Sequence, residues 1–83
     1  MNNSPAAGAG AVDIEIAARI SNALIVKNIN VRAVSDATGI AYPTLRRSLS
    51  GGRSLTFLEL GKIAAAIDVP PSTLLPPALT EAA

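Results

Sequence analysis

Two adjacent arginines, Arg46 and Arg47, are the most chemically distinctive pair in this 83-residue chain. A guanidinium group is always charged and presents its N–H donors in a planar fork, which suits phosphate oxygens and the O6 and N7 acceptors of guanine. Tyr42 and Thr44 lie just before the arginines, and both can touch a phosphate or a thymine methyl group. These residue types indicate contact with nucleic acid; two arginines on a solvated helix face are the alternative interpretation.

The composition argues against most other chemistries. The chain has no cysteine and no histidine, which excludes disulfides and thiolate zinc sites and makes histidine-based catalysis unavailable. Its six acidic residues are scattered, so we expect no enzyme activity, no metal, no cofactor and no small-molecule effector. No apolar run approaches the ~18 residues of a membrane span, and the N-terminus lacks the pattern of a secretory signal. We therefore expect a cytoplasmic protein that does not bind membranes.

The stretch that must position the arginines, Val31 to Leu49, has the pattern of two short helices joined by a turn. Gly39 falls at the turn, since a residue just past a helix end often adopts left-handed backbone angles that glycine reaches freely. Ile40 can then fold back onto the first helix. Val34 and Leu45 fall where the inward faces of the two helices meet. This spacing predicts a helix-turn-helix.

The second of these helices, over residues 43–50, carries the arginines. Pro43 suits its beginning, because the first N–H groups of a helix have no partner. Tyr42 precedes a proline and is predicted as the cap or the last residue of the turn. Leu45 and Leu49 are four residues apart and are predicted to point inward. Thr44 and Arg47 are left on the outward side, with Tyr42 at the entrance of the helix and Arg46 on a flank.

The net charge is only +1, but the charges are segregated along the chain. Between Arg19 and Leu58, six basic residues oppose the single acid Asp36, a local charge of +5. A basic segment of this kind is typical of a DNA-binding face, although a soluble helical protein also scatters arginines over its surface.

From Asn30 to Leu75 the sequence resembles the lambda-repressor-like family of helix-turn-helix DNA-binding domains, which includes phage repressors and Cro proteins. The similar segments are NVRAVSDATGI, PTLRRSLSG, LTFLELGKIAAAIDV and PPSTLL, and Ile16 to Lys27 fits the first helix of that family. The resemblance implies an all-α fold, a compact bundle of about five short helices over residues 13–75. Residues 1–12 are then expected to form a flexible arm, and residues 76–83 a flexible tail.

The resemblance also implies which residues contact DNA. In this family the first outward residues of the second helix-turn-helix helix, and one residue a turn later, meet base edges in the major groove. By position, Arg47 is predicted to read a base, and Arg46 to contact a base or the backbone. Arg32 lies where that family places the DNA backbone, so it is interpreted as a phosphate contact or as an ordinary solvated side chain. The complete predicted DNA-binding set is Arg32, Tyr42, Pro43, Thr44, Arg46, Arg47, Ser50 and Arg53.

The loop that follows the arginines offers a further phosphate site. Gly51 and Gly52 permit a tight turn and close approach of the backbone to a phosphate, which Arg53 is predicted to bind. Gly51 is equally explained by the end of the helix.

Capping patterns predict the remaining elements. Asp13 is a predicted N-cap of the first helix, and Thr56 with Glu59 is a capping box at the start of a fourth. The predicted buried face of the fourth helix consists of Phe57, Leu60, Ile63, Ala64 and Ile67. A short fifth helix is expected over residues 70–75, where Leu74 and Leu75 close the core or contact a second subunit.

Three aliphatic residues of the first helix, Ile14, Ile25 and Val26, fall outside its predicted buried stripe. They are interpreted either as packing against the last helix or as an exposed patch for a partner or a second copy.

We therefore predict a sequence-specific double-stranded DNA-binding protein, a small transcriptional regulator of a phage or mobile element that acts as a repressor. A homodimer through Leu74 and Leu75, or through Ile25 and Val26, is expected because one domain contacts only a short half-site. The alternatives are a helical protein-interaction module of the antitoxin type, and an excision or recombination accessory factor.

Overall fold

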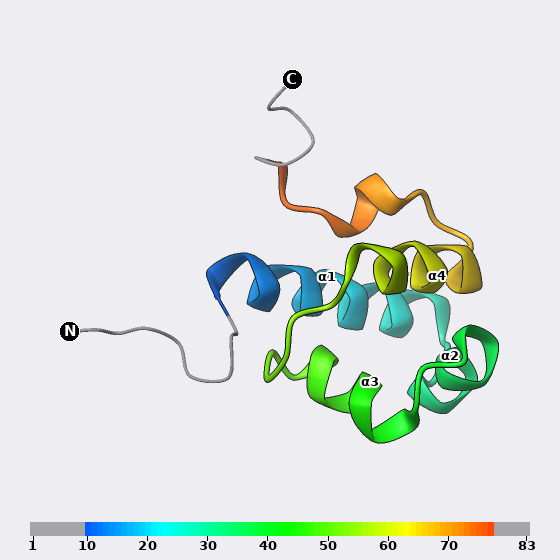
Figure 1. Cartoon of the computed structure of the whole chain (residues 1–83). Coiled ribbons are helices and arrows are strands. Elements are labelled where there is room, and N and C mark those ends of the chain that lie inside the picture. The colour runs from blue at the N-terminus through cyan, green and yellow to red at the C-terminus, as the bar shows by residue number, and fades with distance from the viewer. Residues whose placement is uncertain (1–9, 78–83) are drawn as a thin grey trace.

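A computed structural model describes residues 10–77, which form four α-helices and one 3-10 turn and contain no strand (Figure 1). The elements are α1 (Ala11–Lys27), α2 (Val31–Thr38), α3 (Tyr42–Leu49), α4 (Phe57–Ile67) and η2 (Pro71–Leu74). The predicted all-α fold is confirmed, with the expected fifth helix reduced to the single turn η2. The expected flexible arm and tail lie mostly outside the described residues, apart from Gly10, Ala11 and Val12, which cap and begin α1, and positions 76 and 77.

Helix α1 begins earlier than the sequence pattern predicted. Gly10 is the N-cap, and the side chain of Asp13 accepts a hydrogen bond from the Gly10 main-chain N–H at 3.1 Å. The prediction that Asp13 is the N-cap was therefore wrong, because its carboxylate acts from the third helical position, as the acid of a capping box does. The same carboxylate accepts a hydrogen bond from the Ser54 hydroxyl at 2.7 Å, which ties the loop before α4 to the start of α1.

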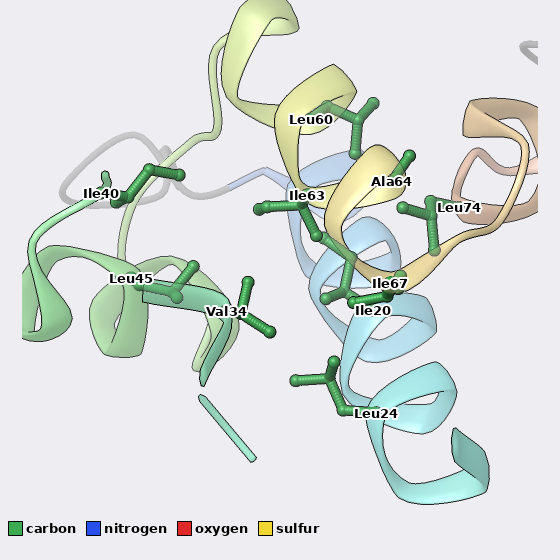
Figure 2. Packing of buried hydrophobic residues seen from close by; sticks show 10 residues of the cluster. All are labelled: Ile20, Leu24, Val34, Ile40, Leu45, Leu60, Ile63, Ala64, Ile67 and Leu74. Carbon is green, nitrogen blue, oxygen red and sulfur yellow. The ribbon is translucent and has the colours of Figure 1, made fainter. Parts of the chain in front are cut away.

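Every element contributes to one aliphatic core (Figure 2). Val34 and Leu45 are 2% and 0% exposed, which confirms the predicted contact between the inward faces of α2 and α3. The side chains that form this core are Ile20, Leu24, Val34, Ile40, Leu45, Leu60, Ile63, Ala64, Ile67 and Leu74. The C-terminal segment belongs to this core, since Leu74 is fully buried and Leu75 is half-buried against it. Of the two roles expected for this leucine pair, the structure therefore shows closure of the core.

Phe57 was wrongly predicted to be buried. It is the first residue of α4 and its side chain is 88% exposed. The buried face of α4 begins one turn later, at Leu60, and the first turn of the helix extends beyond the core.

The surplus aliphatic residues of α1 are also exposed. Ile14 is 55% exposed, and Ile25 and Val26 are each 76% exposed. The interpretation that they pack against the last helix was wrong, because the C-terminal element is one short turn and cannot cover this length of α1. All three are exposed instead, as in the alternative interpretation.

The arrangement in space leaves α3 at one side of the molecule. Figure 1 shows α3 on the side opposite η2, with α1 and α4 between them. None of the helices in residues 10–77 is long and apolar enough to cross a membrane.

Candidate nucleic-acid interface

The turn between α2 and α3 is fixed by three side chains. Gly39 ends α2 with a φ of 78°, in the left-handed region where a side chain is strained. The buried Ser35 hydroxyl donates to the Ile40 carbonyl oxygen at 2.6 Å, and the Ile40 N–H donates to the Thr38 hydroxyl at 3.2 Å. Since Ile40 itself is buried, these contacts hold α3 at a defined position against α2.

The inward side of α3 differs from the prediction in one respect. Leu45 is fully buried as expected, but its partner on the buried face is Ser48, which is 1% exposed, whereas Leu49 is only half-buried. Ser48 lies three residues after Leu45 on the same helical face, and its hydroxyl donates to the Thr44 carbonyl oxygen at 3.2 Å. The hydroxyl also accepts a hydrogen bond from Arg53 at 2.7 Å, so the buried polar group is satisfied.

The outward side of α3 carries the predicted contact residues. Pro43, Arg46 and Arg47 are exposed, and Thr44 is half-buried. Tyr42 is the first helical residue rather than the cap, which is Ala41, so the tyrosine ring lies at the entrance of α3.

Tyr42 brings two arginines together. The guanidinium carbon of Arg32, in the first turn of α2, lies 4.1 Å from the centre of the Tyr42 ring. The guanidinium carbon of Arg46, one turn further along α3, lies 6.0 Å from the same centre. Both distances are within the range of cation–π attraction. Sequence reasoning placed these residues in one predicted set but missed their contact, because nothing in the spacing of Arg32 and Tyr42 shows that the turn brings them together.

Arg53 has partners inside the protein. Its guanidinium forms two hydrogen bonds of 3.1 Å each to the two carboxylate oxygens of Glu59, in addition to its bond to Ser48. Arg53 thereby joins the end of α3 to the start of α4. Its predicted role as a phosphate contact stays a prediction, whereas its role in joining these helices is visible.

The end of α3 is a Schellman motif. The N–H of Gly52 donates to the Arg47 carbonyl oxygen at 2.9 Å, and that of Gly51 to the Ser48 carbonyl oxygen at 3.1 Å. Gly51 has a φ of 84°, which explains the glycine as the end of the helix. Ser50 is exposed, and its hydroxyl donates to the Arg47 carbonyl oxygen at 2.9 Å.

The positive charges divide into paired and unpaired groups. Arg19 pairs with Glu15 and Arg53 pairs with Glu59, both at 3.1 Å. Within residues 10–77, no ion pair forms at Arg32, Arg46 or Arg47. These three guanidinium groups therefore supply the free positive charge on the α2–α3 side of the molecule.

A groove borders this charge, between the end of α1, the start of α2 and the flank of α3. Its floor includes Leu24, Ile29 and Leu49, and Arg32, Tyr42 and Arg46 lie along it. Asn28 also lines the groove but is absent from the predicted DNA-binding set. The linker Asn28-Ile29-Asn30 between the first two helices, with its two asparagines, is the sequence feature that could have indicated it. The lining contains no acidic residue, so the groove suits an anionic occupant.

Comparison with solved structures identifies the same fold. The chain is similar to the restriction-modification controller protein C.AhdI from Aeromonas hydrophila, with a TM-score of 0.75. The two chains are 18% identical, and the match covers 80% of this chain and all of the controller protein. A search of curated protein sequences finds no match.

Comparison with protein-family models assigns the domain. Residues 19–77 match the model of the Cro/C1-type HTH DNA-binding domain, and this range includes α2, α3 and the turn between them. The match confirms the predicted family and the prediction of a DNA-binding domain rather than an enzyme. The chain belongs to the family of Cro/C1-type helix-turn-helix DNA-binding domains.

Proposed function

We propose that this protein is a transcriptional regulator that binds double-stranded DNA in a sequence-specific manner, with α3 in the major groove. The observation that carries the proposal is the pair of exposed, unpaired arginines, Arg46 and Arg47, on a short helix that the buried turn at Ile40 holds in place. The fold shared with a restriction-modification controller protein supports a regulatory role. We further propose that the protein is a repressor encoded by a phage or mobile element.

Affinity and specificity are assigned to different residues. Arg32 supplies salt-dependent attraction to phosphates, because each neutralised phosphate releases counterions. Arg47 reads a base edge, with Thr44 beside it; one good bidentate contact discriminates against the wrong base by about 1–3 kcal/mol. Pro43 adds apolar contact only, since it has no side-chain donor or acceptor. Ser50 is proposed as a further polar contact near the end of α3.

A homodimer is part of the proposal. One helix-turn-helix domain covers a short half-site, so tight binding calls for two copies on a pseudo-palindrome. Because Leu74 is buried in its own core, the exposed Ile25 and Val26 are the better candidates for the subunit contact.

The proposal is tested by titrating the protein, at several salt concentrations, against a fluorescently labelled duplex that carries the motif enriched from a random pool, with a mixed-sequence duplex as the reference. Arg47→Ala is compared with Lys62→Ala, which removes one positive charge from the exposed side of α4. We expect Arg47→Ala to weaken binding severalfold, and Lys62→Ala to bind as the original chain does. Equal effects of the two variants, or no binding at any salt concentration, would contradict the proposal.

The exposed aliphatic surface of α1 favours a second candidate, a protein-interaction module. Ile14, Ile25 and Val26 are all more than half exposed, and they would be covered if a partner protein bound along α1. Charge reversal at Arg46 and Arg47 is expected to abolish DNA binding and spare protein pairing. Val26→Asp is expected to have the opposite effect, because Val26 is exposed and does not line the groove that Arg32 and Arg46 border. The two changes together separate the candidates.

A further inference from the structure

The contact between Tyr42 and its two arginines joins the helices of the helix-turn-helix on their outer side. The half-buried Tyr42 ring lies at the entrance of α3, while Arg32 and Arg46 are exposed and reach it from α2 and α3 respectively. The ring therefore supports two flexible cationic side chains that belong to different helices.

Stacking of this kind leaves the hydrogen-bond donors of a guanidinium group available. The N–H bonds of arginine lie in the plane of the group, whereas the attraction to an aromatic ring acts through its face. Neither Arg32 nor Arg46 has an acidic partner in the part of the chain that the structure describes. Both line the acid-free groove between α1, α2 and α3. The two groups are thus presented together toward an anion.

We propose that Tyr42 is a positioning residue, whose ring holds the guanidinium groups of Arg32 and Arg46 so that together they bind phosphates on one strand of the DNA duplex. We call these two arginines, held by the ring, the clamp. This inference rests on the proposed function and deepens it, since it assigns Arg46 to the backbone and leaves base reading to Arg47. The physical gain is preorganisation: a side chain already held against a ring loses less conformational freedom when the phosphate binds.

The test combines three variants and a mixed-sequence duplex at one moderate salt concentration. Tyr42→Phe keeps the ring, whereas Tyr42→Leu keeps an apolar side chain and removes the ring. We expect Tyr42→Leu to bind about two- to fivefold more weakly, from the usual size of an exposed cation–π contact. Tyr42→Phe is expected to bind within about twofold of the original chain. Arg32→Lys keeps the charge but loses the planar guanidinium group, and we expect it to bind DNA more weakly, as Tyr42→Leu does.

A double-mutant comparison shows whether the ring acts through the arginines. In a chain that carries Arg32→Ala and Arg46→Ala, we expect Tyr42→Leu to have no further effect on binding. The inference would be overturned if Tyr42→Leu still weakens DNA binding two- to fivefold in the chain without the two arginines, or if Tyr42→Leu does not weaken DNA binding in the original chain. If Tyr42→Leu unfolds the protein, the ring-induced shift of the Arg32 resonances, measured on the original chain, keeps the test decisive.

An NMR measurement on the free protein separates this inference from the proposed function. A ring 4.1 Å from the Arg32 guanidinium shifts the resonances of that side chain, and we expect the shift in the original chain and in Tyr42→Phe but not in Tyr42→Leu. If the shift is present and no variant binds duplex DNA, the proposed function fails and the clamp fails with it. If DNA binds normally and the shift is missing, the clamp alone is overturned.

Discussion

Replacement of Glu59 by glutamine is expected to destabilise the domain through a single ion pair. Glu59 accepts two hydrogen bonds of 3.1 Å from Arg53 and one of 2.9 Å from the Thr56 main-chain N–H. The capping box at the start of α4 tolerates glutamine, since its amide oxygen can still accept from Thr56. Glu59→Gln therefore removes the charge that faces Arg53 and one of the two hydrogen bonds from Arg53, because the amide nitrogen of glutamine cannot accept a hydrogen bond.

The size of the effect follows from partial burial. The side chains of Arg53 and Glu59 are 24% and 20% exposed, so solvent screens this pair less than a surface pair. Hydrogen bonds to charged groups are worth more than neutral ones, and we expect a loss of about 1–2 kcal/mol in the free energy of unfolding. For a domain of this size, that loss lowers the melting temperature by roughly 4–16 °C.

The Arg53–Glu59 pair should also make the free energy of unfolding depend on pH. The hydrogen bonds from the Arg53 side chain, followed by that from the Thr56 N–H, hold the pKa of Glu59 below its ordinary value. A lowered pKa in the folded state adds stability above the ordinary glutamate pKa, and this stability is lost as the pH falls through the folded value. The difference between the original chain and Glu59→Gln should therefore be full at pH 7 and shrink in acid.

Urea denaturation monitored by circular dichroism measures both the loss of unfolding free energy in Glu59→Gln and its dependence on pH. The matched control is Glu15→Gln, which removes the other carboxylate-to-arginine pair, also 3.1 Å long but with side chains 36% and 46% exposed. We expect the control to cost no more than about 0.5 kcal/mol. The reasoning is refuted if Glu59→Gln is no worse than Glu15→Gln, or if its effect is unchanged at low pH.

Three further substitutions test the fold by the same denaturation assay. Gly39→Ala meets no atom within 4 Å, so its expected loss of about 1 kcal/mol comes from the backbone angle alone, and a neutral result would argue against the left-handed turn. Leu45→Ala empties a fully buried position and should cost about 2–5 kcal/mol; a loss below about 1 kcal/mol would contradict its place in the core. Phe57→Ser should change stability by less than about 0.5 kcal/mol, because the ring is 88% exposed; strong destabilisation would show that the ring is buried.

The helix-turn-helix itself was predictable from the sequence because its signals are local. Gly39 marks the turn through its backbone freedom, and the spacing of Val34 and Leu45 places the inward faces of α2 and α3. These signals depend on residues a few positions apart, which the helical period relates directly.

The errors arose where the answer depends on neighbouring elements. Helical spacing placed Phe57 on the same stripe as Leu60, but it does not show where the core ends. One of the two interpretations of Ile25 and Val26 had them covered by a last helix, and the chain forms only one turn there, so that they are exposed as in the other interpretation. In each case the helical spacing was correct, but the sequence does not show how far the neighbouring element extends along the helix.

Pairings across loops were equally out of reach. The partners of Arg53 inside the protein, Ser48 and Glu59, lie on two different helices, and its position after two glycines does not indicate them; its contact with a phosphate stays a prediction. The stacking of Arg32 on Tyr42 likewise depends on the angle between α2 and α3. Charge and spacing identify such residues as candidates, and only the fold decides which of them face outward.

The central claim, that α3 reads a DNA sequence through Arg47, is tested most directly by selection from a pool of random duplexes. The original chain and Arg47→Ala are each incubated with the pool at moderate salt, and the retained duplexes are sequenced. We expect one enriched motif with the original chain, and loss of preference at one position of each half-site with Arg47→Ala. Retention without any motif, or an identical motif with Arg47→Ala, would contradict the claim.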